Sequence, residues 1–223
     1  MAIVLGKFQG EGLKAIALRG SAWTVLGHGA NQLIRLGSNV ILAYLLFPAA
    51  FGLMALVNPV VFGIGMMSDI GLGQAIVHNK RGEDKTFLNT AWTLQLIRGA
   101  LIWLIVIIIA YPFSVIYEQP AILWLLPLLG LTSIIMGFQS VAVFTANRKL
   151  QLGRLNWMEF LSNLIGVALM LLWAYFDRSS VLPLVGGAIM IALLRVLFSH
   201  HLLEAHTHRL QWDRPAVKEL LHF

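Results

Sequence analysis

The sequence predicts an all-α integral membrane protein, a bundle of about six transmembrane helices. Hydrophobic residues make up 58% of the 223 residues and charged residues only 12%, whereas soluble domains average about 25% charged residues. The mean hydropathy is +0.79, and the apolar runs are about 20 residues long, which is the length that a helix needs to cross a bilayer. Spans of this length are helices, because a membrane barrel shows alternating segments of about ten residues.

The first three spans are separated by loops of opposite charge character. The first span covers roughly 21–46 and ends at a corner around Pro48 that has no basic residue. The second span, 53–76, leads into the basic loop HNKRGEDKT, and the third span covers 88–113. We expect the basic loop to lie on the cytoplasmic side, because lysine and arginine concentrate there.

The last three spans continue this alternation. The loop SVIYEQP has no basic residue and precedes a span over 122–146, which is followed by the basic loop ANRKLQLGR. The fifth and sixth spans, 156–176 and 181–203, flank a loop whose basic residue is Arg178. Twelve of the 16 lysines and arginines thus fall on one side, one on the other and three inside spans. The pattern predicts a multi-pass protein with both termini in the cytoplasm, and it explains the pI of about 10.0 without nucleic acid as a partner.

The sequence divides into three parts. Residues 1–20 mix charges with short apolar runs, which is typical of an interfacial lead-in rather than a signal peptide. Residues 21–203 form the six-helix bundle, and residues 204–223 form a cytoplasmic connector. The sequence has no cysteine, which excludes disulfides, thiolate metal sites and cysteine nucleophiles.

An arginine near the middle of the first span is the strongest functional signal. Arg35 lies three or four residues from Asn31, Gln32 and Asn39, so these side chains share one face of a helix. A charge at the centre of a membrane helix costs at least ~2.5–3.5 kcal/mol. We therefore expect Arg35 to face protein or a water-filled cavity, and the amides to bind a ligand with it.

Two further arginines, Arg98 and Arg195, lie inside spans three and six. Three guanidinium groups favour an anionic ligand, and arginine binds phosphate through paired hydrogen bonds. Asp69 and Glu159 lie near the cytoplasmic ends of spans two and five and are weak candidates for an ion-coupling role. The alternative, that these charged groups hold helices together or reach for the headgroups, stays open.

The histidines and the known catalytic motifs give little support for an enzyme. His200, His201, His206 and His208 cluster beside the last span. A membrane metal site needs several histidine groups from different helices, so we interpret the cluster as part of a basic interfacial tail. The sequence has neither a nucleophile elbow nor a phosphate-binding loop. We predict no metal, no cofactor and no enzymatic activity.

Four stretches resemble the polysaccharide-exporting flippases of the multidrug/oligosaccharidyl-lipid/polysaccharide exporter superfamily. They are RGSAWTVLG at 19–27, RLGSNVILAYLLFPAAFGLMALV at 35–57, SDIGLGQAIVHNKRGEDKTFLNTAW at 68–92 and WDRPAVKELLHF at 212–223. The chain departs from the family pattern in two places. Tyr44 stands where an arginine is common, and Ala49 and Ala50 replace two acidic residues.

The resemblance implies that the chain is the N-terminal half of a transporter with two bundles that form a V around a central cavity. The implied function is alternating-access export of an undecaprenyl-diphosphate-linked glycan across a bacterial inner membrane, for lipopolysaccharide or exopolysaccharide synthesis. The implied partners are the glycan lipid, the lipid bilayer and a missing C-terminal bundle. The implied substrate contacts are made by Arg35, Arg98 and Arg195 to the diphosphate and by Asn31, Gln32 and Asn39 to the sugars.

Three alternatives remain. An integral-membrane enzyme of lipid or glycan metabolism would use the histidine cluster at one membrane face. A drug/cation antiporter of the same superfamily would prefer acidic cavity residues, which the arginines argue against. A structural or assembly subunit would use the polar face of the first helix only to hold helices together.

Overall fold

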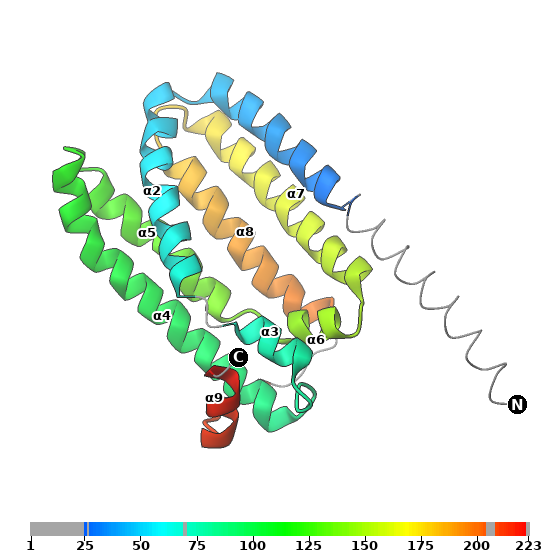
Figure 1. The fold of residues 1–223 in the computed structure, drawn as a ribbon. Coiled ribbons are helices and arrows are strands. Elements are labelled where there is room, and N and C mark those ends of the chain that lie inside the picture. The colour runs from blue at the N-terminus through cyan, green and yellow to red at the C-terminus, as the bar shows by residue number, and fades with distance from the viewer. Residues whose placement is uncertain (1–24, 26, 69–70, 204–207, 222–223) are drawn as a thin grey trace, which may run out of the picture.

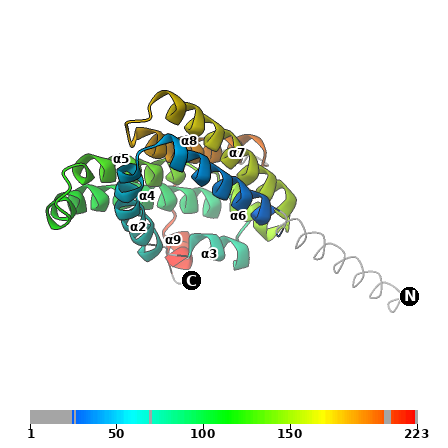
Figure 2. The same cartoon turned by 90° about the horizontal axis from the view of Figure 1, so that it is seen from above.

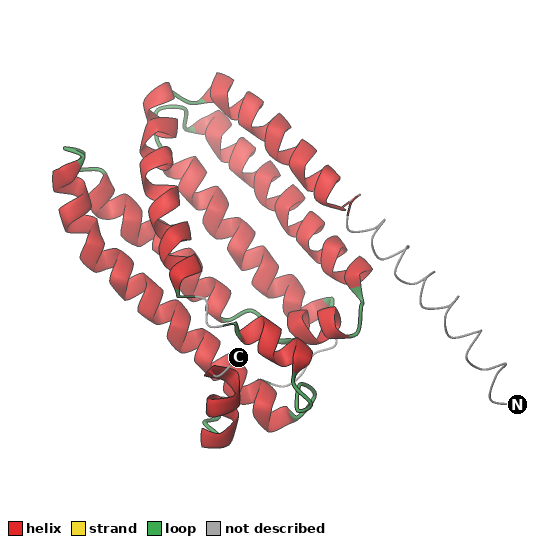
Figure 3. Ribbon diagram, in the orientation of Figure 1, coloured by secondary structure: helices red, strands yellow, loops and turns green. Residues whose placement is uncertain are grey.

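The structure, a computed structural model, describes residue 25 and residues 27–68, 71–203 and 208–221. The lead-in over 1–20, Asp69 and His206 lie outside the described residues. Within the described ranges the regular structure is helical (Figure 3). A helix over residues 27–45 is followed by α2 (Pro48–Met67), α3 (Leu72–His78), α4 (Lys85–Ile116), α5 (Ile122–Gly137), α6 (Ala142–Arg148), α7 (Leu152–Phe176), α8 (Leu182–His201) and α9 (Arg214–Leu221).

The long helices run alongside one another and reverse direction at each end of the bundle (Figures 1 and 2). Four of them, α2, α4, α7 and α8, are long and apolar enough to cross a membrane, and α5 with α6 makes a fifth span bent by 60°. The helix over residues 27–45 is not among these candidates. The all-helical membrane bundle is confirmed, whereas the expected number of six spans is not.

Two expected spans are interrupted near the same end of the bundle. The span expected over 53–76 is divided, because α2 ends at Met67 and α3 begins only after Gly71, whose φ of 68° is a left-handed conformation that favours glycine. The span expected over 122–146 breaks between α5 and α6, where the chain turns by 60°. Both breaks place polar backbone groups beside α4.

Glycines allow the closest helix contacts in the bundle. A Cβ on Gly99 of α4 would stand 2.5 Å from the carbonyl oxygen of Ser133 on α5, and a Cβ on Gly166 of α7 would collide with Ile191 on α8. Membrane helices pack closely where small residues face each other. The helix over residues 27–45 lies along α7, where Leu42 packs against Ala174 (Figure 1).

The end of the bundle that holds α3, α6 and α9 carries most of the described basic residues. They are Lys80, Arg81, Lys85, Arg148, Lys149, Arg154, Arg209, Arg214 and Lys218. Arg178 lies in the loop between α7 and α8 at the other end. The fold therefore gathers the basic loops at one end, which we call the basic end, and its exposure to the cytoplasm stays a prediction.

The described C-terminal segment, residues 208–221, folds back onto the basic end. Arg81 binds Glu219 of α9 at 3.2 Å, Asp84 at 2.9 Å and Asp213 at 3.5 Å. Ala216 and Leu220 of α9 are buried in a cluster with residues of α3 and α4. Residues 208–221 are therefore docked against the bundle by both ion pairs and apolar contacts.

Candidate functional site

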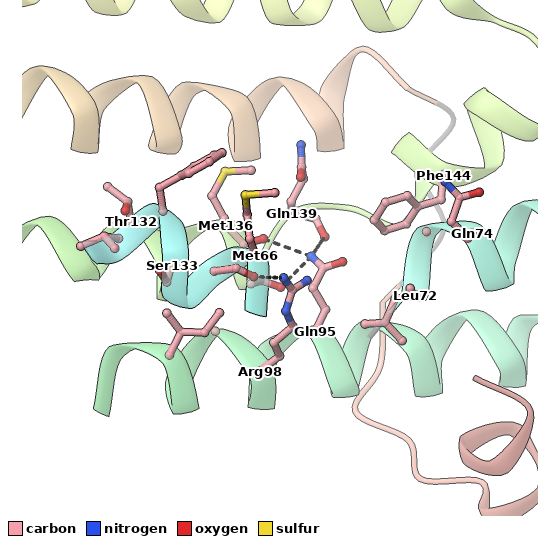
Figure 4. Close-up of a pocket in the computed structure, with 18 of the residues that line it drawn as sticks. Met66, Leu72, Gln74, Gln95, Arg98, Thr132, Ser133, Met136, Gln139 and Phe144 are labelled. Carbon is pink, nitrogen blue, oxygen red and sulfur yellow. Dashed lines mark hydrogen bonds between the residues drawn. The ribbon is translucent and has the colours of Figure 1, made fainter. Parts of the chain in front are cut away.

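A pocket of about 600 Å³ opens between α2, α3, α4, α5 and α6 near the basic end (Figure 4). Its apolar walls include Phe62 and Met66 of α2, Met136 of α5 and Phe144 of α6. Its polar lining consists of one arginine and six amide or hydroxyl side chains, namely Arg98, Gln74, Gln95, Thr132, Ser133, Gln139 and Asn147. No acidic side chain occurs among the described residues that line it.

Arg98 joins the pocket floor to the end of α2. Its Nη2 donates to the carbonyl oxygen of Gly65 at 2.9 Å, and its Nε donates to the hydroxyl of Ser68 at 3.3 Å. The carbonyls at the C-terminal end of a helix carry partial negative charge, so a guanidinium is stabilised there. Arg98 therefore fixes α2 to α4 at the point where the second span is interrupted.

Gln95 of α4 hydrogen-bonds to the backbone at the other interruption, between α5 and α6. Its Nε2 lies 3.0 Å from the carbonyl oxygen of Met136, 3.1 Å from that of Gly137 and 3.0 Å from that of Gln139. Because α5 stops there, these carbonyls fall outside the regular helical pattern, and that of Met136 also accepts from the backbone N–H of Gln139 at 3.1 Å. One side chain from α4 thus satisfies the backbone at the bend and sets the shape of the pocket beside it (Figure 4).

Several polar groups of the pocket are available to a ligand. In the described part of the chain, the side-chain amides of Gln74, Gln139 and Asn147 and the hydroxyl of Ser133 make no hydrogen bond to protein. Gln74 and Asn147 are exposed at the rim. Each amide offers both a donor and an acceptor.

A second polar arrangement links three helices on the opposite side of α8. Nη2 of Arg195 on α8 donates to Oδ1 of Asn163 on α7 at 3.4 Å, and Nδ2 of Asn163 donates to Oδ1 of Asn31 at 3.0 Å. Nε of Arg195 is buried without a partner in the described structure. These contacts hold the helix over residues 27–45 against α7.

Arg35, Gln32 and Asn39 form a third group, the outer face of the helix over residues 27–45. All three are exposed, and Arg35 has no side-chain partner among the described residues. Ser38, at the edge of this face, is instead buried: it is 5% exposed and donates to the carbonyl oxygen of Arg35 at 3.0 Å. A guanidinium near the middle of this helix therefore faces away from the described bundle.

The structure thus distributes the predicted substrate residues over three places. Arg98 lines the pocket, Arg195 and Asn31 join helices, and Arg35, Gln32 and Asn39 form the outer face. Glu159 is half-buried on α7. Asn163, Gln95 and the amides of the pocket were not among the predicted site residues. Gln95 lies three residues before Arg98, so a shared helix face was the signal that could have identified it.

Two described histidines, His200 in the last turn of α8 and His208 beyond it, contact the backbone at the bend between α5 and α6. Nε2 of His208 accepts a hydrogen bond from the backbone N–H of Val141 at 3.2 Å, and Nε2 of His200 lies 3.0 Å from the carbonyl oxygen of Phe138. Among the residues described, no group of three or more histidines and carboxylates is arranged to hold a metal ion. His208 thus ties the segment that begins at residue 208 to the bend, and His200 ties the end of α8 to it.

Comparisons with known proteins identify the family. The family model described as "polysaccharide biosynthesis protein" matches residues 41–223. A protein of Klebsiella pneumoniae described as "Uncharacterized membrane protein in cps region" is 21% identical over 208 residues, which cover 93% of this chain and 42% of that protein. The chain therefore spans less than half the length of this relative. No solved structure matches the chain. Because the family match extends over most of the sequence, the chain belongs to the polysaccharide biosynthesis protein family, and it is a membrane protein of that family.

Proposed function

We propose that the chain is the N-terminal bundle of a flippase that exports an undecaprenyl-diphosphate-linked glycan for lipopolysaccharide or exopolysaccharide synthesis. The exposed position of Arg35, flanked by Gln32 and Asn39, is the observation that carries this proposal. A charge that faced lipid at this depth would cost several kcal/mol, so something outside the described bundle must cover it. A second bundle and an anionic substrate together supply that cover.

The match to the family supports this arrangement. The relative from Klebsiella pneumoniae extends well beyond the part that this chain matches. In the proposed protein a C-terminal bundle lies opposite the outer face of the helix over residues 27–45. A central cavity separates the two bundles. The two bundles rock about a site near the middle of the membrane, so that the site opens to the cytoplasm and then to the outside of the inner membrane. No covalent bond is made or broken.

Arg35 is the proposed contact of the diphosphate. A guanidinium pairs with phosphate oxygens through two parallel hydrogen bonds, which fixes orientation as well as charge. Gln32 and Asn39 would then bond the hydroxyls of the adjacent sugar, while Arg98 and Arg195 keep the interior of the bundle positive. Asp69 or Glu159 would carry a coupling ion.

The test is a series of Arg35 variants in the complete gene, with protein abundance and surface polysaccharide measured together. We expect Arg35→Lys to retain part of the export, because the charge remains and the paired geometry is lost. Arg35→Gln should lower export by roughly tenfold or more, because hydrogen bonds to charged groups contribute about 1.5–3 kcal/mol. Arg35→Glu should abolish export at unchanged abundance.

The matched control is Arg178→Glu, which reverses an exposed arginine in the loop between α7 and α8. This variant should export normally. Normal export by a well-expressed Arg35→Glu protein would remove Arg35 from the substrate path. A loss of abundance with Arg35→Gln would instead indicate that Arg35 stabilises the fold.

A further inference from the structure

We infer that the pocket between α2 and α5 binds the outer sugars of the lipid-linked glycan while its diphosphate is held elsewhere. This inference rests on the proposed function and adds a second contact site to it. The pocket is built from α2, α3, α4, α5 and α6 of this chain alone. It is separate from the outer face of the helix over residues 27–45, because none of that helix's residues lines it.

The polar lining matches sugar hydroxyls. A hydroxyl group both donates and accepts hydrogen bonds, and so does a carboxamide. Gln74, Gln139 and Asn147 present carboxamides that are not used by the described protein, and Ser133 adds a free hydroxyl. A ligand rich in hydroxyls can use these groups without any charge. The described lining has no carboxylate, so neutral sugars and acidic sugars are both acceptable.

The apolar walls match the other surfaces of a sugar ring. Phe62 and Met66 stand on one side of the pocket, and Met136 and Phe144 contribute from α5 and α6. Sugar rings expose C–H groups on their faces, which pack against aromatic rings and thioethers. The volume of about 600 Å³ lies within the range of small-molecule sites, which are mainly apolar with a few placed polar groups.

The pocket keeps its shape without a ligand. Arg98 ties the end of α2 to α4, and Gln95 ties the bend after α5 to the same helix. A site whose walls are already fixed loses less freedom when it binds. An acyl chain would fill the same volume, but it would desolvate the half-buried carboxamide of Gln139 and hydroxyl of Ser133 without giving them partners.

Gly65 allows a sharp test of the pocket. It lines the pocket, and a Cβ added to it would meet nothing within 4 Å. Gly65→Leu therefore places a side chain in the empty volume and also improves helix propensity. Gly63 on the same helix has equally open space, but it does not line the pocket. Gly63→Leu is the matched control.

The experiment measures lipid binding to the purified chain in nanodiscs by native mass spectrometry. The two probes are undecaprenyl diphosphate and undecaprenyl diphosphate that carries a disaccharide of N-acetylated sugars. We expect the wild type and Gly63→Leu to bind the glycosylated lipid about tenfold more tightly, as two or three net hydrogen bonds would give. Gly65→Leu should bind both lipids with the same affinity as the wild type binds the bare lipid.

Two further variants test the pocket even if Gly65→Leu fails to fold. Gln74→Ala and Asn147→Ala change exposed rim residues, and each should reduce the preference for the glycosylated lipid by roughly threefold. An unchanged preference in all three pocket variants would overturn the inference, and so would equal binding of both probes by the wild type. Weaker binding of both lipids by Gly65→Leu would assign the pocket to the lipid chain and would also overturn it.

Failure of the proposed function has a different signature. Deletion of the gene would then leave surface polysaccharide unchanged, whatever the purified chain binds. Deletion of the gene could instead stop export while the pocket variants export and bind as the wild type does. That result would support the proposed function and would refute sugar binding in the pocket.

Discussion

At the scale of single residues, Asn163 is the side chain on which a three-helix contact depends. Its oxygen accepts from Arg195 and its nitrogen donates to Asn31. We predict that Asn163→Leu destabilises the bundle by about 1–3 kcal/mol, because both partners become unsatisfied in a dry environment. A shift of the thermal unfolding midpoint in detergent measures the effect.

The control for this prediction is Asn156→Leu on the same helix. Nδ2 of Asn156 is buried without a hydrogen-bond partner in the described structure, so replacing this amide with an apolar side chain of similar size should leave the midpoint unchanged or raise it. Equal destabilisation by the two variants would show that Asn163 contributes packing rather than hydrogen bonds.

At the scale of helices, the contact between α4 and α5 depends on the absence of a side chain at Gly99. The nearest atom to an added Cβ is a backbone oxygen, that of Ser133 at 2.5 Å, and a backbone atom moves only if the helix moves. We predict that Gly99→Val lowers stability by about 1–3 kcal/mol or more, as overpacking does. Gly37→Val is the comparison, because a Cβ at Gly37 meets nothing within 4 Å. If the two variants accumulate equally in membranes, the close contact of α4 with α5 is wrong.

The docking of α9 should weaken in acid. The Arg81 side chain, through hydrogen bonding, holds the pKa of Asp84 below its ordinary value of 3.8. Asn79 and then Arg81 hold the pKa of Glu219 below 4.5. Groups with a lowered folded pKa stabilise the fold above their ordinary pKa, and this stabilisation is lost as the pH falls through the folded pKa.

We therefore expect hydrogen exchange in 214–221 to be constant above about pH 4.5, after correction for intrinsic rates, and to accelerate below it. Because these groups are exposed, the effect should be local rather than global. The double variant Asn79→Ala/Arg81→Gln should remove most of the pH dependence, because Asn79 is the larger and Arg81 the smaller cause of the lowered pKa of Glu219. Lys80→Gln, at a neighbouring exposed position, should preserve it. A pH response that survives in the double variant would exclude this cluster as its source.

At the scale of the whole molecule, the gathering of basic loops at one end predicts the orientation in the membrane. The chain has no cysteine, so single cysteines can be introduced without background. In intact cells an impermeant thiol reagent should label Ser179→Cys, in the loop between α7 and α8, and should spare Lys85→Cys at the basic end. Labelling of Lys85→Cys in intact cells and not of Ser179→Cys would reverse the orientation, and equal labelling would contradict the topology.

The fold class followed from the sequence, because lipid accepts only helices whose apolar length matches its thickness. The interruptions did not, because hydropathy is insensitive to the backbone conformation of Gly71 and to the 60° bend after Gly137. The contact of Arg195 with Asn163 could not be predicted from the sequence either, because residues on α7 and α8 meet only after the helices pack. The position of Arg35 near the middle of its helix was predictable, but its outward orientation was not.

The two kinds of glycine in the bundle have different consequences for evolution. A substitution at Gly99 or Gly166 meets an occupied neighbour, whereas Gly65 faces open volume in the pocket wall. Variation at Gly65 would therefore change the size of the pocket while the helix packing stays as it is. In the proposed flippase, a single codon would thus adapt the pocket to a bulkier or slimmer glycan without disturbing the contacts between helices.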